Sequence, residues 1–283
     1  MTSPPWSSED AALVARVASQ LVDCSPLGIA FSGGVDSSVL AALAARTLGT
    51  EQVLAIIGVS PSLAKDERIQ AHEVARFIGV EVVEVATHEG DREAYRRNGP
   101  DRCFHCKDEL FTRISDEVIA AHDLRAVAYG ENADDAKQLD RPGARAATAH
   151  RVLRPLAEAG LTKAAVRRIA HGLELPCADK PASPCLASRI PHFQEVDPGK
   201  LRQIEQAEAS LRGLGFGDLR VRHHGDVARI ELAGEDLERA VTLPLRGLIQ
   251  AAMTAAGFRF ATVDLAGIQS GAFTMPLVAS RRG

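Results

Sequence analysis

The chain has 283 residues, of which 46% are hydrophobic, and its formal net charge is −4 at pH 7. This composition supports a buried core, argues against disorder and gives no electrostatic case for nucleic-acid binding, so no nucleic-acid partner is expected. No apolar run approaches the roughly 20 residues of a membrane span, and the N-terminus lacks a basic, apolar signal, so we expect a cytoplasmic protein without membrane contact.

The first motif is a glycine-rich loop. Two glycines separate an apolar run at residues 27–31 from an alanine-rich, helix-forming segment at 35–48. Backbone N–H groups of such a loop and the helix N-terminus can surround an anion, and serine hydroxyls add donors. The loop lacks the lysine of the common P-loop, so it predicts a different phosphate site, with a plain Gly-Ser turn as the alternative. The predicted phosphate-binding residues are Ser32, Gly33, Gly34, Val35, Asp36, Ser37 and Ser38.

Strands and helices alternate on both sides of this loop. The strands expected after it are 53–59, 81–85 and 126–130, and the expected helices include 7–23, 64–78, 108–121 and 162–171. Such alternation indicates βαβ units, and therefore an α/β fold with a Rossmann-like parallel sheet. Ligands of these sheets bind at the carboxyl ends of the strands, where the glycine-rich loop lies. We expect residues 1–196 to form this domain.

Acidic side chains follow the expected strand at 126–130. Asn132, Asp134 and Asp135 come directly after Gly130. Carboxylates at a strand end suit Mg²⁺, which binds through one or two carboxylates plus substrate phosphates, and a solvated turn with a helix cap is the alternative. Residues 140–145 are expected to form a loop that brings Arg141 and Arg145 near this edge.

The C-terminal part changes in character. Residues 172–198 form a proline-rich loop with charged and thiol side chains, which is typical of a functional loop. A second, small α+β domain is expected over 197–283. Its expected elements are a helix at 198–214, a hairpin at 219–232 with its turn at 224–226, a helix at 237–256 and a strand at 258–265.

The five cysteines favour thiol chemistry or metal ligation, because structural disulfides are rare in the cytoplasm. Cys103 and Cys106 form a Cys-x-x-Cys pair that is open to redox, zinc or iron–sulfur interpretations. Cys185 is the expected third partner, because its loop must return to the same strand ends, whereas Cys177 has no charged neighbour and is expected to be structural. Three thiolates would leave one iron of a four-iron cluster open to an external ligand.

Arginines alternate in the expected hairpin. Arg220 and Arg222 lie two residues apart and therefore on one face, where guanidinium pairs can grip a phosphate. A solvated strand face is the alternative interpretation of this pair. His223 and His224 are expected to be exposed near the turn.

Taken together, the motifs resemble the LarE family, the ATP-dependent sulfur transferases of nickel-pincer nucleotide synthesis, from about residue 25 to 270. The loop at 32–37 is shared with the whole PP-loop superfamily of ATP pyrophosphatases. The other matching motifs are Gly130-x-Asn132-x-Asp134-Asp135, Arg141-Pro142-Gly143, Asp179-Lys180-Pro181 with Cys185-Leu186-Ala187-Ser188-Arg189, and Arg220-Val221-Arg222-His223-His224-Gly225-Asp226.

The resemblance implies a reaction. The enzyme would use ATP and Mg²⁺ to adenylate a carboxylate of pyridinium-3,5-biscarboxylic acid mononucleotide, a small nucleotide, and sulfur would then displace AMP. In one branch of the family the residue matching Cys185 is a sacrificial donor that ends as dehydroalanine. In another, three cysteines hold a [4Fe-4S] cluster that carries an extra sulfide from a sulfide donor, and Cys103, Cys106 and Cys185 match this second branch.

The resemblance also assigns roles to other residues. Gly130 and Asp135 join the ATP-binding loop, and Arg220, Arg222 and Glu231 bind the substrate phosphate. Lys180 and Arg189 would stabilise the anionic intermediate. The family forms hexamers, so a homo-oligomer is implied. The sequence departs from the family at Gly267-Ile268-Gln269-Ser270-Gly271, where Gly-Tyr-Arg-Ser-Gly is usual.

Three other functions remain open on the sequence. An amide-forming PP-loop synthetase would need none of the three cysteines. A tRNA-thiolation or other nucleic-acid adaptor is disfavoured by the acidic balance. A metal or redox sensor would bind iron without substrate-dependent release of pyrophosphate.

Overall fold

The computed structural model describes residues 6–137 and 142–269. The chain divides into two compact units, one of Met1–Glu89 with Cys103–Ser183 and the other of Gly90–Arg102 with Pro184–Gly283. The domain boundary expected between residues 196 and 197 stays a prediction. No helix in the described ranges is both long and apolar enough to cross a membrane.

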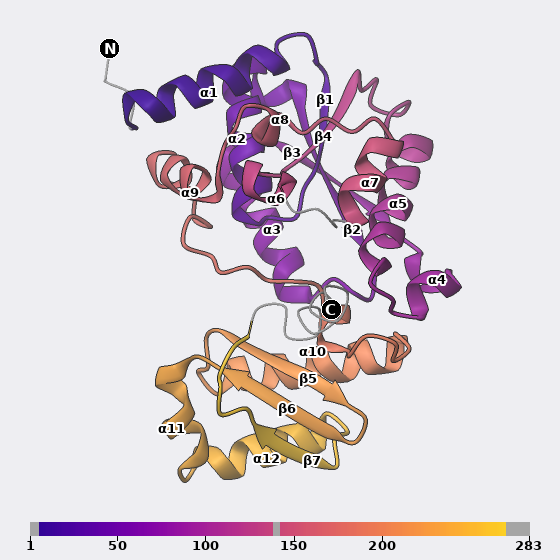
Figure 1. The fold of residues 1–283 in the computed structure, drawn as a ribbon, viewed down its shortest axis with the longest axis vertical. Helices are drawn as coiled ribbons and strands as arrows, with labels where there is room; N and C mark the ends of the chain where they lie inside the picture. Colours follow the sequence, from indigo (N-terminus) through magenta and orange to yellow (C-terminus); the bar gives the residue numbers. More distant parts are fainter. Residues whose placement is uncertain (1–5, 138–141, 270–283) are drawn as a thin grey trace, which may run out of the picture. The chain divides into compact units, whose positions relative to one another are not determined.

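The first unit contains the parallel sheet that the alternation predicted. Its strands are β1 (Leu27–Ala30), β2 (Val53–Val59), β3 (Glu81–Ala86) and β4 (Ala126–Tyr129) (Figure 1). They pair in the order β3-β2-β1-β4, and each pair is parallel. Both inner strands, β1 and β2, lack charged side chains because both faces of the sheet are covered. The predicted α/β fold with a Rossmann-like parallel sheet is therefore confirmed.

Helices cover both faces of this sheet. Successive β2 side chains point to opposite faces, so Val53, Ala55 and Ile57 join one apolar cluster while Leu54 and Ile56 join another. The first cluster includes residues of α1 (Ser8–Leu21), α2 (Val35–Leu48), α3 (Lys65–Ile78) and α9 (Lys163–Gly172). The second includes residues of α5 (Arg102–Arg113), a π-helical turn (Ile114–Val118) and α7 (Pro142–Ala149). The short helices α6 (Ala133–Ala136) and α8 (Pro155–Glu158) complete this unit.

Two helices differ from the sequence prediction. Helix α5 begins at Arg102 and not at Asp108, so the Cys103–Cys106 pair lies inside its first turns. Pro100 precedes the helix, and Phe111 anchors its apolar face in the core. Helix α7 occupies most of the segment expected as a loop at 140–145, because a proline at the first helical position is compatible with a helix start. Arg141 lies outside the described residues.

The second unit is the expected small α+β unit. Helix α10 (Pro198–Gly213) precedes the antiparallel hairpin of β5 (Leu219–His224) and β6 (Val227–Leu232), and β7 (Phe260–Val263) adds to β6 in parallel. The prediction of a single helix at 237–256 is wrong, because the segment forms two helices, α11 (Leu237–Val241) and α12 (Leu245–Ala255). They are separate because Pro244 cannot donate a helical hydrogen bond. Before these elements lie α4 (Glu93–Arg96) and a 3₁₀ turn (Leu186–Arg189).

Candidate functional site

The glycine-rich loop joins β1 to α2 and is held by serine hydroxyls. Ser37 Oγ donates to the carbonyl oxygen of Gly34 at 3.0 Å and accepts from the backbone N–H of Ser32 at 3.3 Å. Gly34 is the N-cap of α2 and has no side chain to cap the first N–H groups, which therefore stay available to an anion. Ser38 is fully buried instead, and its hydroxyl has no hydrogen-bond partner among the described residues.

Two glycines fix the shape of this loop. Gly33 has a φ of +66°, and a Cβ there would lie 2.6 Å from the Cα of Ala71 on α3. A Cβ at Gly130, just after β4, would lie 2.5 Å from the backbone nitrogen of Ser37. Such distances exclude any side chain, so the loop and the end of β4 approach each other closely. The structure thus brings Gly130 to the predicted phosphate-binding loop.

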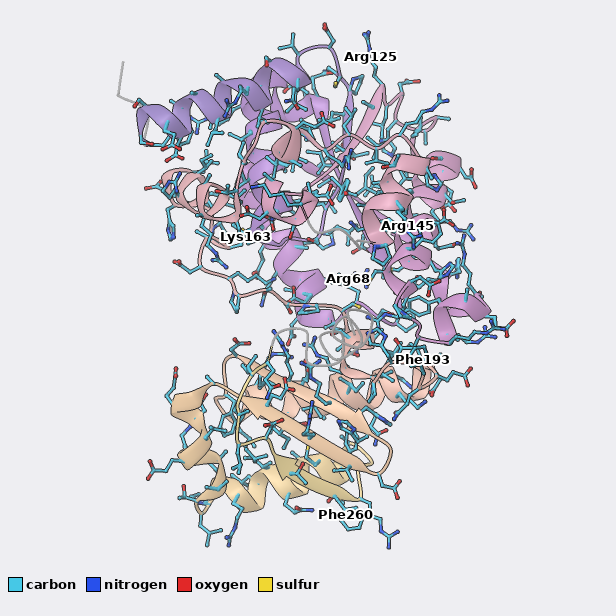
Figure 2. The ribbon with its side chains drawn as sticks, in the orientation of Figure 1. Arg68, Arg125, Arg145, Lys163, Phe193 and Phe260 are labelled. Atoms are coloured by element: carbon cyan, nitrogen blue, oxygen red, sulfur yellow. The ribbon has the colours of Figure 1, made fainter. Side chains whose placement is uncertain are left out.

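A polar network joins the loop to β4 and α9. Asp36 accepts hydrogen bonds from Asn132 Nδ2 at 3.2 Å and from Lys163 Nζ at 2.5 Å. Asn132 Nδ2 also donates to Asp135 at 2.8 Å, and Asn132 Oδ1 caps α6 by accepting from the backbone of Asp134 and Asp135. Figure 2 labels Lys163 at the start of α9. Asp36 and Asp135, which were expected at the carboxyl ends of the strands, are therefore linked through the side-chain amide of Asn132.

Lys163 is a site residue that the sequence did not reveal. The sequence predicted a helix start at Thr162, and Thr162 is the N-cap of α9, but nothing in the pattern linked the next residue to Asp36. The backbone N–H of Lys163 also donates to Asp134 at 2.8 Å. Both ends of this residue are thus held beside the loop, with its ammonium group partly exposed.

Two further cationic residues of the first unit, Lys180 and Arg145, contact side chains of neighbouring helices. Lys180 forms an ion pair with Glu67 on α3 at 2.7 Å. The Arg145 guanidinium lies over the ring of Phe104 on α5, 5.4 Å from its centroid, and Figure 2 labels this arginine. Both are thus held by side chains of neighbouring helices.

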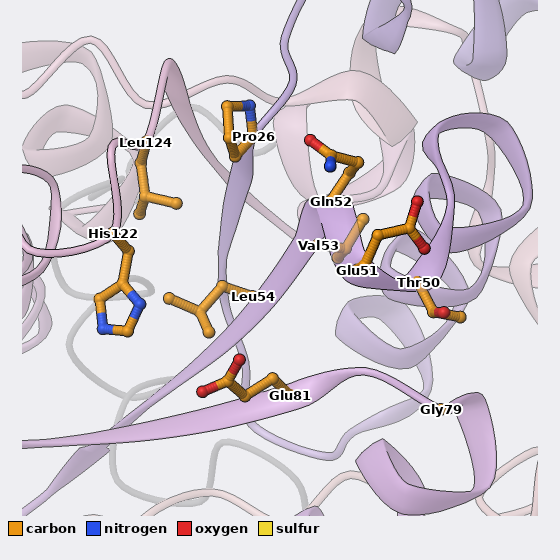
Figure 3. A pocket seen from close by; sticks show the side chains of 10 residues that line it. All are labelled: Pro26, Thr50, Glu51, Gln52, Val53, Leu54, Gly79, Glu81, His122 and Leu124. Carbon is orange, nitrogen blue, oxygen red and sulfur yellow. The ribbon is translucent and has the colours of Figure 1, made fainter.

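A cavity of about 300 Å³ lies at the opposite edge of the same sheet (Figure 3). Its lining includes Pro26, Val53 and Glu81, which lie at the amino ends of β1, β2 and β3. Ligands of parallel sheets bind at the carboxyl ends. This cavity therefore does not belong to the candidate site.

The second unit contains a buried cluster of arginines and carboxylates. Arg222 makes two hydrogen bonds to Glu231, at 3.0 and 2.9 Å, and both side chains are buried. Arg220 faces Glu231 across the hairpin, and Arg220 and Arg222 both donate to the carbonyl oxygen of Gln269. Burial, reinforced by the charges of Arg189 and Arg222, lowers the pKa of Arg220. The structure thus brings the three predicted phosphate-binding residues together.

The turn that carries Cys185 is held by arginines of the same unit. Cys185 is the exposed N-cap of the 3₁₀ turn, and Arg189 donates to the carbonyl oxygen of Pro184 at 2.8 Å. The Arg189 guanidinium is buried against Glu208 of α10, at 2.8 Å, and Glu208 also accepts from the backbone N–H of Val221. Glu208, which sequence reasoning missed, therefore links the turn to β5.

The remaining predicted ligands fall in both units. Cys103 is exposed and Cys106 half-buried on α5, whereas Cys177 is buried in the core of the first unit, as expected of a structural cysteine. Within 6–137 and 142–269, no three His, Cys, Asp or Glu side chains are grouped as metal ligands. Cys103 and Cys106 belong to the first unit and Cys185 to the second.

The expectation that His223 is exposed is wrong. Its ring is buried beside Phe258, at 5.4 Å between centroids, and Nε2 lies 3.1 Å from Gln203 Oε1. Burial lowers the pKa of His223 and favours its neutral form. The reason is the strand period of two, which places His223 on the face opposite Arg222, against α10 and the core.

Known proteins resemble this chain over most of its length. The family model described as asparagine synthase matches residues 10–134. The pyridinium-3,5-bisthiocarboxylic acid mononucleotide synthase of Lactiplantibacillus plantarum is 31% identical over 257 residues, which are 91% of this chain and 92% of that protein. Uncharacterized protein slr1717 of Synechocystis is 40% identical over 243 residues, 86% of this chain and 90% of that protein.

The fold, the lysine-free anion-binding loop and the matched model define an ATP-using enzyme of the PP-loop class. Within this class the chain belongs to the LarE family of ATP-dependent sulfur transferases, as the match to the synthase over nearly the whole of both chains shows. The resemblance to this family is confirmed, whereas the three-cysteine iron–sulfur type stays a prediction.

Proposed function

We propose that this enzyme converts pyridinium-3,5-biscarboxylic acid mononucleotide into the corresponding thiocarboxylates. A substrate carboxylate oxygen attacks the α-phosphorus of ATP, and the bond to the β,γ-pyrophosphate breaks. Sulfide then attacks the acyl carbon of the resulting acyl-adenylate, the bond to AMP breaks and AMP leaves with its electron pair. A second round converts the other carboxylate. The proposal is supported by the kinship with the synthase named for this product.

The first unit supplies the residues for adenylation. The N–H groups of Gly33, Gly34 and the first turn of α2 suit the pyrophosphate, which binds at helix N-termini of this kind. Asp36 and Asp135 would hold Mg²⁺, since this ion takes one or two carboxylates together with substrate phosphates. Asn132 already orients both carboxylates, and Lys163 balances the charge of Asp36 until ATP and Mg²⁺ arrive.

The second unit supplies the residues for the substrate phosphate. Arg220 and Arg222 present guanidinium groups on one face of β5, and Arg222 is oriented by its two bonds to Glu231. Guanidinium groups grip phosphate through paired hydrogen bonds. Glu231 would hence act by positioning Arg222. Lys180 and Arg189 would offset the negative charge of the acyl-adenylate reaction.

Cys103, Cys106 and Cys185 would hold a [4Fe-4S] cluster. The first two lie three residues apart on α5 and therefore on one side of the helix, and Cys185 is exposed at a turn. When bound by three thiolates, such a cluster has an open iron and supplies the sulfide. The same exposure of Cys185 also suits the sacrificial donor role, so the two roles must be separated by experiment.

The observation that carries the proposal is the Asp36–Asn132–Asp135 network beside an uncapped helix N-terminus. We expect Asp36→Ala to abolish AMP and pyrophosphate formation from ATP, Mg²⁺ and substrate. Asp116→Ala, at an exposed position of the same unit, serves as the matched control and should keep full activity. AMP formation by Asp36→Ala at the parent rate would contradict the adenylation site, and incorporation of ammonia in place of sulfide would indicate an amide synthetase.

The cluster has its own test. Protein purified without oxygen should contain iron and acid-labile sulfide, and the Cys103→Ala, Cys106→Ala double variant should contain neither. A parent protein without iron, which loses the sulfur of Cys185 after one turnover, would instead establish the sacrificial donor.

A further inference from the structure

The glycine-rich loop of the first unit carries no cation of its own, since no lysine or arginine lies between Ser32 and Ser38. The charge of Mg²⁺ and the charges of Asp36 and Asp135 would largely cancel each other. Cationic side chains must therefore balance the charge that develops on the pyrophosphate leaving group. Lys163 of α9 is one such cation, because its ammonium group contacts Asp36.

Lys180 is a second cation beside the loop, and its ion pair shows where its ammonium group lies. Lys180 Nζ bonds at 2.7 Å to Glu67, which lies in the first turn of α3, after the carboxyl end of β2 (Figure 1). Ala71 of the same helix lies against the loop, since a Cβ on Gly33 would be 2.6 Å from its Cα. Glu67 and Ala71 are four residues apart and thus share one face of α3. The Lys180 ammonium group therefore lies about one helical turn from the place where α3 meets the loop.

Arg167 holds the backbone of the segment that carries Lys180. Its guanidinium donates from Nη1 to the carbonyl oxygen of Ala178 at 2.8 Å and from Nη2 to that of Lys180 at 3.2 Å. Arg167 follows Lys163 by four residues on α9, so both side chains project from the same side of this helix. Helix α9 thus presents one lysine to the loop directly and fixes the other through Arg167.

We infer that Lys180 binds the β,γ-pyrophosphate of ATP and that Arg167 is the residue that positions Lys180. This inference rests on the proposed function, because pyrophosphate is the leaving group of the adenylation step. Without ATP, Glu67 balances the charge of Lys180 as Asp36 balances that of Lys163. The side chains of Lys180 and Glu67 are 15% and 22% exposed, so solvent weakens their pair and the ammonium group can turn to the phosphates. There it stabilises the negative charge that the pyrophosphate gains when its bond to the α-phosphorus breaks.

The test is calorimetric titration of the full chain with inorganic pyrophosphate and Mg²⁺, and separately with AMP. We expect Lys180→Met to weaken pyrophosphate binding at least about tenfold, as the loss of a charge-assisted hydrogen bond implies, and to change AMP binding less than about twofold. The control is Arg76→Met, which removes an exposed cation from the last turn of α3. It should bind both ligands as the parent does.

The role of Arg167 is tested by a double-mutant cycle on pyrophosphate binding. Arg167→Met should weaken binding about fivefold in the parent, but less than about twofold in the Lys180→Met background, because Arg167 acts through Lys180. A general loss of structure would weaken binding of pyrophosphate and AMP alike in both backgrounds. Equal effects of Arg167→Met in the two backgrounds would therefore overturn the positioning role.

The outcomes separate this inference from the proposed function. A parent protein that binds no pyrophosphate would overturn the ATP site and the role of Lys180 with it. A parent that binds pyrophosphate no better than Lys180→Met would overturn the role of Lys180 alone. Should Lys180→Met not fold, Lys180→Gln decides, since it keeps a donor for Glu67 without the charge. We expect weaker pyrophosphate binding by this variant, and an unchanged affinity refutes the role.

Discussion

Lys163 offers a direct test of the ATP site, because its ammonium group contacts the Asp36 carboxylate at 2.5 Å. We consider Lys163→Met, which keeps most of the aliphatic stem and removes the charge. The two side chains are 39% and 19% exposed, so solvent screens the pair and its contribution to the free energy of unfolding is at most about 1 kcal/mol. The variant should therefore fold.

The effect on ATP is expected to be larger. Two unit charges about 4 Å apart interact by about 4 kcal/mol at an effective dielectric constant of roughly 20. Allowing for the partial exposure of the ammonium group, we take half of this value, about 2 kcal/mol, which corresponds to roughly a 30-fold loss of kcat/KM for ATP. The reason is that the Lys163 ammonium group would contact the phosphates of ATP, which bind beside Asp36.

The assay is pyrophosphate release at varied ATP, together with urea unfolding of the same protein. Lys137→Met is the matched control, since Lys137 lies 3.8 Å from Asp134 but its side chain is 74% exposed. It should lower kcat/KM less than twofold. A change of less than threefold for Lys163→Met would show that Lys163 does not contact the phosphates of ATP, and a destabilisation large enough to unfold the protein would show that the ion pair is structural.

Three further predictions concern packing, pH and the cysteines. Gly130→Ala should destabilise the protein by about 2 kcal/mol in urea unfolding and abolish pyrophosphate release, because its Cβ would lie 2.5 Å from the backbone nitrogen of Ser37. An unchanged midpoint of urea unfolding would contradict this close approach. The bond from Arg68 lowers the pKa of Glu84 to about 2, so this stabilisation is complete above pH 4.5 and fades as the pH falls toward 2. Glu84→Gln should accordingly lower the free energy of unfolding by about 0.5 kcal/mol at pH 7 and by progressively less below pH 4.5; a difference that does not depend on pH would contradict this assignment. Cys177→Ser should cost about 1–3 kcal/mol of stability by burying a hydroxyl in the core, with iron content unchanged; loss of iron would make Cys177 a ligand.

The sequence sufficed for elements that strong local patterns define. The apolar run at 53–59 is β2 over the same residues, and Asp197 caps α10 as its position before Pro198 indicated. The glycine-rich loop lies between β1 and α2, because the apolar run before the two glycines forms a strand and the alanine-rich segment after them forms a helix. These features depend on residues near one another in the chain.

Contacts between distant residues could not be derived in the same way. Lys163 meets Asp36 across 127 positions, and Arg102 meets Ala187 across 85. No periodicity encodes such pairs, since they follow from the packing of α9 on α2 in the first unit and from the inclusion of Gly90–Arg102 in the second unit. His223 was misassigned for a related reason: its exposure depends on which face of β5 the core covers, and two adjacent histidines do not specify it.

ATP cleavage and sulfur transfer should be coupled on one substrate in the proposed reaction. We would measure the sulfur incorporated into pyridinium-3,5-biscarboxylic acid mononucleotide for each pyrophosphate released, in oxygen-free buffer with ATP, Mg²⁺ and sulfide. We expect one sulfur per pyrophosphate and per AMP, with a doubly thiolated final product. Sulfur incorporation without pyrophosphate, or cleavage of ATP to ADP and phosphate, would contradict it.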